Sequence, residues 1–504
     1  MTARRSAVAE NDVDSGGYVE WLLYLGIAVT GFGLVLGAVP MAAVGVLIGI
    51  TAFGRGLPRG ALVASAAAAI LWSNAAVVLP GRVGLPAAVG LLPQVLLAAV
   101  VVGRIVARRL PMVTTSAFRV LLLHGAALAM AAIIALDHGP VMGAIISFII
   151  EGVVLWFLVV NAINSESEME RVTAAVVGVC AIIGLVSITQ FATGSYDNDY
   201  LGFAQIDDSR AELLDEAAST GDEVLLRLSG PIGEQNRYAQ SMLVVVPLAL
   251  ALSRVRTSGR LWPLLAVLPI VAAVALTGSR GAVLGLVATL AVMAYLRLVS
   301  MRSVVVVIVA GLLAVSILPG YRDRVFSAFT AVEGIDNQTS EVDGSTLSRV
   351  TENIAAVDMF VDHPLFGVGP SGYPRQYERY AERVGLLVKD QARQPHNLYL
   401  GKAAETGLVG LVTFVAIPAV VLVRLGRLWR ATRSSNSRRA AMAAGYISAI
   451  MAYLATGVFL HLAFERYYWM LLALADAAAT VGLRAIAVEA VEPPDETALV
   501  AASS

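Results

Sequence analysis

The chain contains little charge and almost no lysine. Charged residues make up 14% of its 504 positions, Lys389 and Lys402 are the two lysines, and the formal net charge is −1. A nearly neutral chain offers no electrostatic basis for binding nucleic acid. Hydrophobic residues make up 58% of the sequence, and the mean hydropathy is +0.75. This composition is typical of a polytopic membrane protein and not of a soluble globular one.

Cysteine is nearly absent as well. Cys180 is the single cysteine and lies in an apolar segment. A disulfide framework within the chain and a cysteine-based metal site are therefore both excluded. The first 17 residues are polar, and no small-x-small cleavage site follows them. We therefore expect a retained first helix rather than a cleaved signal peptide.

Long apolar segments recur along the whole chain. A transmembrane helix needs about 20 consecutive apolar residues. Windows of that size predict helices at 20–37, 40–54, 61–80, 85–103, 120–136, 140–162, 172–193, 239–253, 261–277, 281–296, 303–319, 397–423, 441–461 and 467–487. Because several are short and the second could be re-entrant, we expect an all-α polytopic membrane protein with 12–14 transmembrane helices.

Arginines gather in alternate connections between these helices. If the N-terminus is cytoplasmic, the arginine-rich connections are all cytoplasmic, and the short outer ones contain only Arg82, Arg280 and Arg466. The alanine-rich, lysine-poor composition suggests a bacterial genome, so we expect a plasma-membrane protein with both termini inside. Chemistry is then expected on the external face, where nucleotide-activated sugars are not available.

The same segments divide the chain. We expect a disordered cytoplasmic tail at 1–17, a transmembrane bundle at 18–193, an external loop at 194–238, transmembrane helices with a break at Arg280 at 239–319, a large external loop carrying the chemistry at 320–396, transmembrane helices at 397–488 and a disordered tail at 489–504.

The large loop carries two helical patterns. Residues 345–361 place apolar side chains at spacings of four, three and four, which predicts an amphipathic helix on the membrane surface; they are Val350, Ile354, Val357 and Val361. That pattern stops at His363-Pro364. A second helix is expected from about Pro374, with Arg375, Arg379 and Arg383 on one face.

Arg280 interrupts an apolar stretch, in Thr277-Gly278-Ser279-Arg280-Gly281. A charged side chain at membrane depth costs about 2.5–3.5 kcal/mol even on the lenient insertion scale. A guanidinium at a helix break can bind a phosphate or diphosphate through its fork of donors. The alternative is an arginine that snorkels to the interface. The flanking glycines favour the anion site.

Two further groups lie on the same predicted face. Arg227 begins a loop that contains two glycines and ends at Asn236. This loop could present hydrogen-bond donors to a sugar or phosphate. The alternative is that it forms an ordinary turn at the N-terminus of the next helix. His396 precedes the helix at 397–423 and suits proton transfer near neutrality, or it is a capping or interfacial histidine. Lys402 and Glu405 are three residues apart and can pair, which would make Glu405 structural.

Other polar residues are less specific. Glu151, inside the helix at 140–162, suits a transporter, or it pairs with a polar group of a neighbouring helix. Acidic pairs at 197–199 and 207–208 could hold a divalent metal, but acidic loops are common and we expect none. Three histidines are interpreted as structural: His124, His138 and His461.

Three stretches in order resemble the O-antigen ligase family, which includes O-antigen polymerase-like and protein O-oligosaccharyltransferase members. They are Arg227-Leu-Ser-Gly…Asn236, then Thr277-Gly-Ser-Arg280-Gly-Ala, then His363-Pro-Leu-Phe-Gly-Val-Gly369…His396-Asn-Leu-Tyr-Leu…Glu405-Thr-Gly-Leu-Val-Gly410. The resemblance covers about residues 225–420.

The resemblance implies an inverting, GT-C-like glycan transferase that needs no metal or cofactor. Such enzymes pass a glycan from a polyprenyl (undecaprenyl or decaprenyl) diphosphate to an acceptor hydroxyl on a lipid, polysaccharide or protein. It implies that Arg280 and Arg227 hold the diphosphate, that His396 is the essential loop histidine and that Arg349 is a loop arginine of the family pattern. The predicted substrate-binding residues also include Asn236, Arg375, Arg379, Tyr399 and Glu405.

Three functions remain open on the sequence. The first is a glycan ligase or polymerase, two enzymes that share donor chemistry and differ in acceptor. The second is a flippase or transporter for a lipid-linked oligosaccharide, which would use midplane charges such as Glu151. The third is a membrane binding or scaffold protein without turnover.

Overall fold

The computed structural model describes residues 59–82, 84, 86–108, 111–205, 227–256, 259–305, 344–385, 393–461 and 465–490. Within these ranges every regular element is a helix, which confirms the all-α prediction. Eight of the described helices are long and apolar enough to cross a membrane, and a bent pair counts as a ninth if taken as one span. The predicted spans at 20–37 and 40–54, and most of 303–319, lie outside the described residues.

Eight of the other predicted spans coincide with a described helix or with consecutive helices. The spans are η1 (Ala87–Leu91) with α5 (Leu92–Arg108), α6 (Ser116–Ile133), α7 (Val141–Ser147) with the π-helix η2 (Phe148–Val154) and α8 (Leu155–Ala162), α9 (Glu166–Thr193), α11 (Gln235–Leu243) with α12 (Val246–Val255), α19 (Leu398–Thr432), α20 (Ser437–Thr456) with η5 (Gly457–Phe459), and α21 (Glu465–Glu489).

Three predicted spans differ from a simple crossing helix. The segment predicted at 61–80 is bent by 72° between α3 (Arg59–Trp72) and α4 (Ala75–Arg82). Asn74 lies at the bend with a φ of 62°, a conformation that asparagine tolerates better than most residues. The helices α13 (Leu261–Leu276) and α14 (Arg280–Tyr295) have 16 residues each, so they fall short of a full crossing.

The helix α21 forms the centre of the bundle. Every residue from 466 to 482 is buried, and a helix that is covered on all sides belongs to a core. Its one buried acid, Asp476, lies 3.0 Å from Arg424 Nε of α19. The other carboxylate oxygen accepts hydrogen bonds from Thr115 and Trp156. This charge is therefore compensated, as a buried ion requires.

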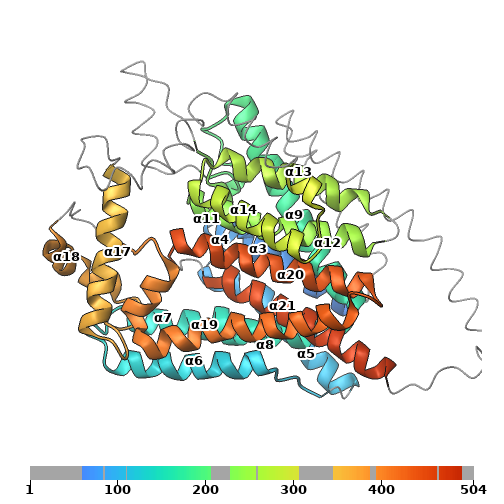
Figure 1. Ribbon diagram of the computed structural model, residues 1–504, viewed down its shortest axis with the longest axis horizontal. Coiled ribbons are helices and arrows are strands. Elements are labelled where there is room, and N and C mark those ends of the chain that lie inside the picture. Colours follow the sequence, from blue (N-terminus) through green and yellow to red (C-terminus); the bar gives the residue numbers. More distant parts are fainter. Residues whose placement is uncertain are drawn as a thin grey trace, which may run out of the picture.

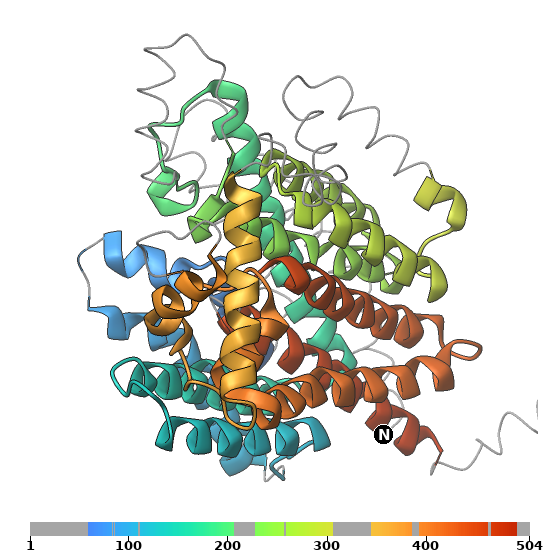
Figure 2. The same ribbon diagram turned by 60° about the vertical axis from the view of Figure 1, so that its left-hand side comes forward.

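The described part of the large loop, residues 344–385, crosses one end of the bundle. Figures 1 and 2 show α17 (Gly344–Asp362) lying across the ends of the long helices, with α18 (Tyr373–Val384) beside it. The predicted helix at 345–361 and its end before His363-Pro364 are thus confirmed. On α18, the predicted arginine face is exposed, and the opposite face buries Tyr373, Tyr377 and Tyr380.

Three of the four residues in the apolar stripe of α17 are exposed. Ile354 is 39% exposed, Val357 42% and Val361 65%. The side that packs on the protein instead carries small and polar residues, namely Ser348, Thr351, Glu352, Ala355, Ala356 and Met359. An exposed apolar stripe fits the expected position on a membrane surface. The buried polar side turns toward the site described below.

Charged residues also gather at the opposite end of the bundle. Arg104 pairs with Glu168 at 2.7 Å, and Arg439 contacts Glu166 at 2.5 Å and Glu489 at 2.6 Å. These arginines are among those predicted to be cytoplasmic, whereas α17 and α18 belong to the loop predicted to be external. The two predicted sides are therefore at different ends of the bundle. Which end faces the cytoplasm stays a prediction.

Candidate active site

A break in α19 fixes the loop that follows α17. The amides of Val368 and Gly369 donate to the carbonyls of Ala404 and Glu405 at 2.9 and 3.0 Å, and the Leu408 amide donates to the Pro364 carbonyl at 2.8 Å. These contacts resemble strand pairing in the middle of a helix.

Gly407 makes this break possible. Its φ of 63° and ψ of −164° lie in a region that is essentially open only to glycine. A Cβ there would lie 2.3 Å from the carbonyl carbon of Leu365. The start of α19 and the loop at 364–369 are therefore held together as one unit.

His396 forms the shortest polar contact of this unit. Its Nδ1 lies 2.5 Å from Oε2 of Glu352 on α17. The Glu352 side chain is 1% exposed and His396 26% exposed. The cap of α19 is Asn397, whose Oδ1 accepts from the amides of Tyr399 and Leu400. The capping alternative for His396 is therefore wrong.

Glu352 was not identified from the sequence. Its second oxygen, Oε1, accepts a hydrogen bond from Ser348 at 3.1 Å, and its backbone carbonyl accepts one from the Tyr373 hydroxyl at 2.6 Å. It lies 44 residues before His396 along the chain. No local pattern connects the two, so only the packed structure reveals the pair.

A second histidine lies beside the first. The ring centroids of His461 and His396 are 6.1 Å apart, with the rings edge to face. Burial lowers the pKa of His461, and the positive charges of Arg237 and Lys402 lower it further. Its buried Nδ1 has no hydrogen-bond partner among the described residues. His461, which was interpreted from the sequence as structural, therefore lies beside His396 at the end of the predicted span at 441–461.

Arg280 begins α14, at the predicted helix break. Gly278 has a φ of 58°, and Ser279 caps α14 by accepting from the Ala282 amide at 3.3 Å. The first turn of α14 then packs on η5, because a Cβ at Gly281 would lie 3.1 Å from Phe459.

The short helix η5 joins the two predicted catalytic segments. Its other side packs against the start of α19, because a Cβ at Gly457 would lie 2.9 Å from the Leu398 side chain. His461 follows two residues after η5. The segment 457–461 therefore contacts the end of α14 that carries Arg280 and also lies beside His396.

Arg227 attaches the first outer loop to the turn before Arg280. Its Nε donates to the Thr277 carbonyl at 2.7 Å, and Nη2 donates to Asn236 Oδ1 at 3.1 Å. Asn236 is in the first turn of α11, which begins at 235 rather than at the predicted 239 because Glu234 accepts from two backbone amides and caps the helix. Both predicted residues thus adjoin the Arg280 turn.

The remaining predicted binding residues have other contacts. The Tyr399 hydroxyl donates to the Leu454 carbonyl at 2.9 Å, which ties α19 to α20. Glu405 lies 3.9 Å from Lys402, which confirms that pair, and its backbone carbonyl accepts from the Gly369 amide at 3.0 Å. The Glu405 backbone therefore helps to hold the loop in place.

The loop arginines differ in position. Arg349 is half-buried on α17, one turn before Glu352. Arg375 lies on the exposed face of α18, 3.8 Å from Asp137, and Arg379 lies on the same face, with its guanidinium 6.0 Å from the Tyr380 ring. Within the described part of the chain, these two arginines contact Asp137 and the Tyr380 ring rather than His396.

The acidic residues considered for metal binding or transport include Asp199 and Glu151, and both form ion pairs with arginines. In the described residues no group of three or more His, Cys, Asp or Glu could hold a metal ion. Asp199 pairs with Arg82, whereas 207–208 lie outside the described residues. Glu151 lies 3.9 Å from Arg466, so the structure supports the pairing alternative for this acid. His124 is buried and contacts Thr413 at 2.9 Å, as a structural histidine does.

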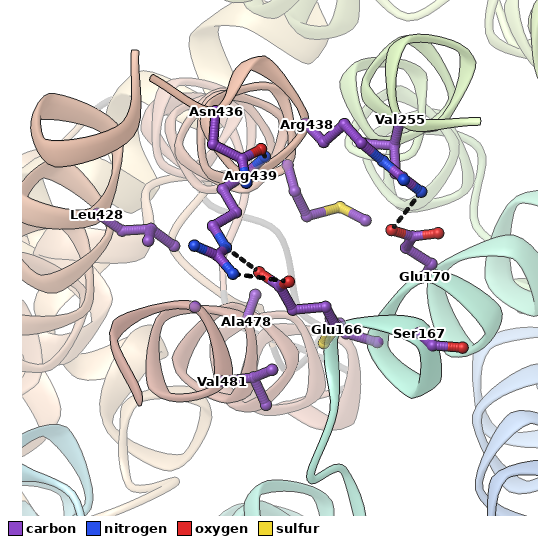
Figure 3. Close-up of a pocket in the computed structure, with 13 residues that line it drawn as sticks. Glu166, Ser167, Glu170, Val255, Leu428, Asn436, Arg438, Arg439, Ala478 and Val481 are labelled. Carbon is purple, nitrogen blue, oxygen red and sulfur yellow. Dashed lines mark hydrogen bonds and ion pairs between the residues drawn. The ribbon is translucent and has the colours of Figure 1, made fainter. Parts of the chain in front are cut away.

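The larger of the described cavities is at the opposite end of the bundle. It has a volume of about 360 Å³ and lies at the start of α20, whereas His461 follows the end of that helix. Twenty residues separate the two ends by roughly 30 Å. Its charged side chains are paired with each other, Arg439 with Glu166 and Arg438 with Glu170 (Figure 3). It is therefore separate from the His396 site.

The fold and this site define a polytopic membrane protein with a polar site at one end of its helices. Residues 264–415 match the family model described as O-antigen ligase. The match includes α13, α14, α17, α18 and the start of α19, and with them Arg280, Glu352 and His396. The chain therefore carries an O-antigen ligase domain over these residues, and such a domain implies a membrane glycan transferase of the ligase or polymerase type. A search among curated proteins found no match.

Proposed function

We propose that this protein transfers a glycan from a polyprenyl diphosphate carrier to an acceptor hydroxyl, on the external face of the bacterial plasma membrane. One observation carries the proposal. The start of α14, with Arg280, and the start of α19, with His396, are distant in sequence, and both lie against segment 457–461. The family match covers both elements.

The proposed reaction is a single inverting displacement. The acceptor oxygen attacks the anomeric carbon of the first sugar, and the bond from that carbon to the phosphate oxygen breaks. The acceptor proton passes to His396, which is 26% exposed beside the buried carboxylate of Glu352. A positioned base of this kind contributes about 10²–10⁴-fold to the rate.

The leaving diphosphate gains charge as the bond breaks. The guanidinium of Arg280 would hold that charge, and Arg227 would support it through the turn to which it is bonded. Fixed donors aimed at developing charge stabilise the transition state more than the ground state. We propose that these arginines provide the countercharge without a metal ion. The same chemistry serves a ligase and a polymerase.

The test measures release of polyprenyl diphosphate by the protein in nanodiscs. The donor is an undecaprenyl diphosphate oligosaccharide, and the comparison is between the wild type, Arg280→Ala and Arg280→Lys with EDTA present. We expect loss of about 10²–10³-fold in kcat for Arg280→Ala, and partial recovery in the lysine variant. Arg427→Ala, exposed at the far end of α19, is the control and keeps full activity. Equal turnover in Arg280→Ala and Arg427→Ala would contradict the proposal.

A further inference from the structure

We propose that Glu352 is a positioning residue that holds His396 with its proton on Nδ1, so that Nε2 carries the free lone pair that takes the acceptor proton. This inference rests on the proposed function, since it assigns the atom at which His396 acts. It is carried by the geometry of α17 against the start of α19, two segments that no local sequence pattern connects.

The contact itself requires a proton between its two atoms. Nδ1 of His396 and Oε2 of Glu352 are 2.5 Å apart, which is short even for a charge-assisted hydrogen bond. A neutral imidazole has one N–H donor and one acceptor nitrogen. The Glu352 carboxylate accepts a hydrogen bond from the Nδ1–H group, so the imidazole proton is on Nδ1. Nε2 then carries the free lone pair and is the base.

The carboxylate cannot easily turn away. Its side chain is 1% exposed, and Oε1 is already engaged by the Ser348 hydroxyl at 3.1 Å. The backbone carbonyl of the same residue accepts from the Tyr373 hydroxyl, which joins α17 to α18. Glu352 is thus held by one hydrogen bond to its side chain from α17 and one to its backbone from α18, as a group that orients a catalytic imidazole has to be.

The charges around the pair agree with this role. His461 faces His396 from the segment after η5, and Arg237 of α11 and Lys402 of α19 act on that second histidine. Glu465 of α21 and Glu405 of α19 lie 3.5 and 3.9 Å from Lys402. Among these groups only Glu352 is in recorded hydrogen-bond contact with His396, so it is the group that would stabilise the imidazolium formed when the proton is taken.

Glu352→Gln gives a sharp prediction because Ser348 sets the direction of the new amide. The amide oxygen takes the place of Oε1 and accepts from Ser348, so the NH₂ group faces His396. That group donates to Nδ1 and forces the imidazole proton onto Nε2. The variant therefore holds the tautomer that cannot accept the acceptor proton.

The tautomer can be measured without any turnover. The chain has five histidines, so ¹⁵N-histidine labelling and solid-state NMR in lipid give few signals. The His396 signal is identified by its loss in His396→Gln. We expect an Nδ1–H imidazole in the wild type and an Nε2–H imidazole in Glu352→Gln. An Nε2–H imidazole in the wild type, or the same tautomer in both proteins, would overturn the inference.

Kinetics provide the second measurement. We expect Glu352→Gln to lower kcat at least ten-fold with little change in KM for the donor, and to move the acid limb of kcat/KM to lower pH because the imidazolium loses its countercharge. Asp358→Asn, elsewhere on α17, is the control and should change neither. If Glu352→Gln does not fold, Ser348→Ala serves instead and should give a smaller loss of kcat without moving the acid limb to lower pH, because the Glu352 carboxylate keeps its charge. Unchanged kcat and pH profile in a folded variant would contradict the role.

The two proposals fail differently. One outcome is that the wild type has the Nδ1–H tautomer and Glu352→Gln the Nε2–H tautomer, but the wild type does not turn over the donor. The transferase proposal then fails and the positioning of His396 stands. If the donor is turned over equally by wild type and Glu352→Gln, the transferase proposal stands and the role of Glu352 is wrong.

Discussion

Gly407→Ala should detach the loop at 364–369 from α19. The native conformation, with φ 63° and ψ −164°, costs a residue with a Cβ about 1–3 kcal/mol. The new Cβ would also lie 2.3 Å from the backbone of Leu365, and overpacking of this kind costs about 1–3 kcal/mol more. The docked state should therefore lose at least about 2 kcal/mol, which is roughly a thirty-fold change in its equilibrium constant.

Hydrogen exchange measures this change where it occurs. The amides of Val368 and Gly369 donate to carbonyls of α19, so their exchange reports opening of the docked loop. We expect exchange at these amides to become at least about thirty-fold faster in Gly407→Ala. Turnover should fall with it, because the same loop holds the start of α19 against α17.

Gly426→Ala is the matched control, since it lies on the same helix. A Cβ there meets only the end of the Arg430 side chain, at 3.9 Å. We expect no loss of stability and no change in exchange at 368–369. If both variants exchange alike, the strained glycine is not what attaches the loop, and the reasoning from its backbone angles is refuted.

Three further predictions concern charged groups. The pKa of His461 is lowered in the folded protein, so as the pH falls the unfolded chain is protonated first. The contribution of His461 to folding stability should therefore be full above about pH 6.5 and fall as the pH drops below it. Measured by thermal unfolding between pH 5 and 8, the loss of stability at low pH should be smaller in His461→Gln. Asp476→Asn leaves Arg424 without its ion partner in the core and should cost about 3–5 kcal/mol, measured by denaturant unfolding in detergent. Glu151→Gln should keep glycan transfer, measured by donor consumption, because this acid pairs with Arg466 rather than lining a transport path; loss of lipid flipping with intact loop residues would instead favour a transporter.

Local sequence patterns were sufficient where glycine, proline or hydropathy set the backbone. The break before Arg280, the end of α17 before His363-Pro364 and the arginine face of α18 are all features of short segments, and the structure confirms each of them.

Partners distant in sequence were not predictable in this way. The Glu352–His396 pair and the place of His461 depend on which helix ends pack together. The burial of α17 depends likewise on tertiary packing, because its apolar stripe is exposed and its polar side is covered. The break at Gly407 was missed for a related reason: hydropathy is continuous across it, and only the docking of 364–369 shows why a glycine is required.

The central claim is that His396 carries the chemistry of a glycan transfer from a polyprenyl diphosphate. The most direct test incubates a labelled undecaprenyl diphosphate oligosaccharide with nanodisc samples of the wild type, His396→Ala and His138→Ala, with EDTA and several acceptors. His138 is exposed in the turn between α6 and α7 and serves as the control. The account predicts release of undecaprenyl diphosphate and a labelled product with the wild type and His138→Ala, and neither with folded His396→Ala. Transfer by His396→Ala at the wild-type rate would contradict it.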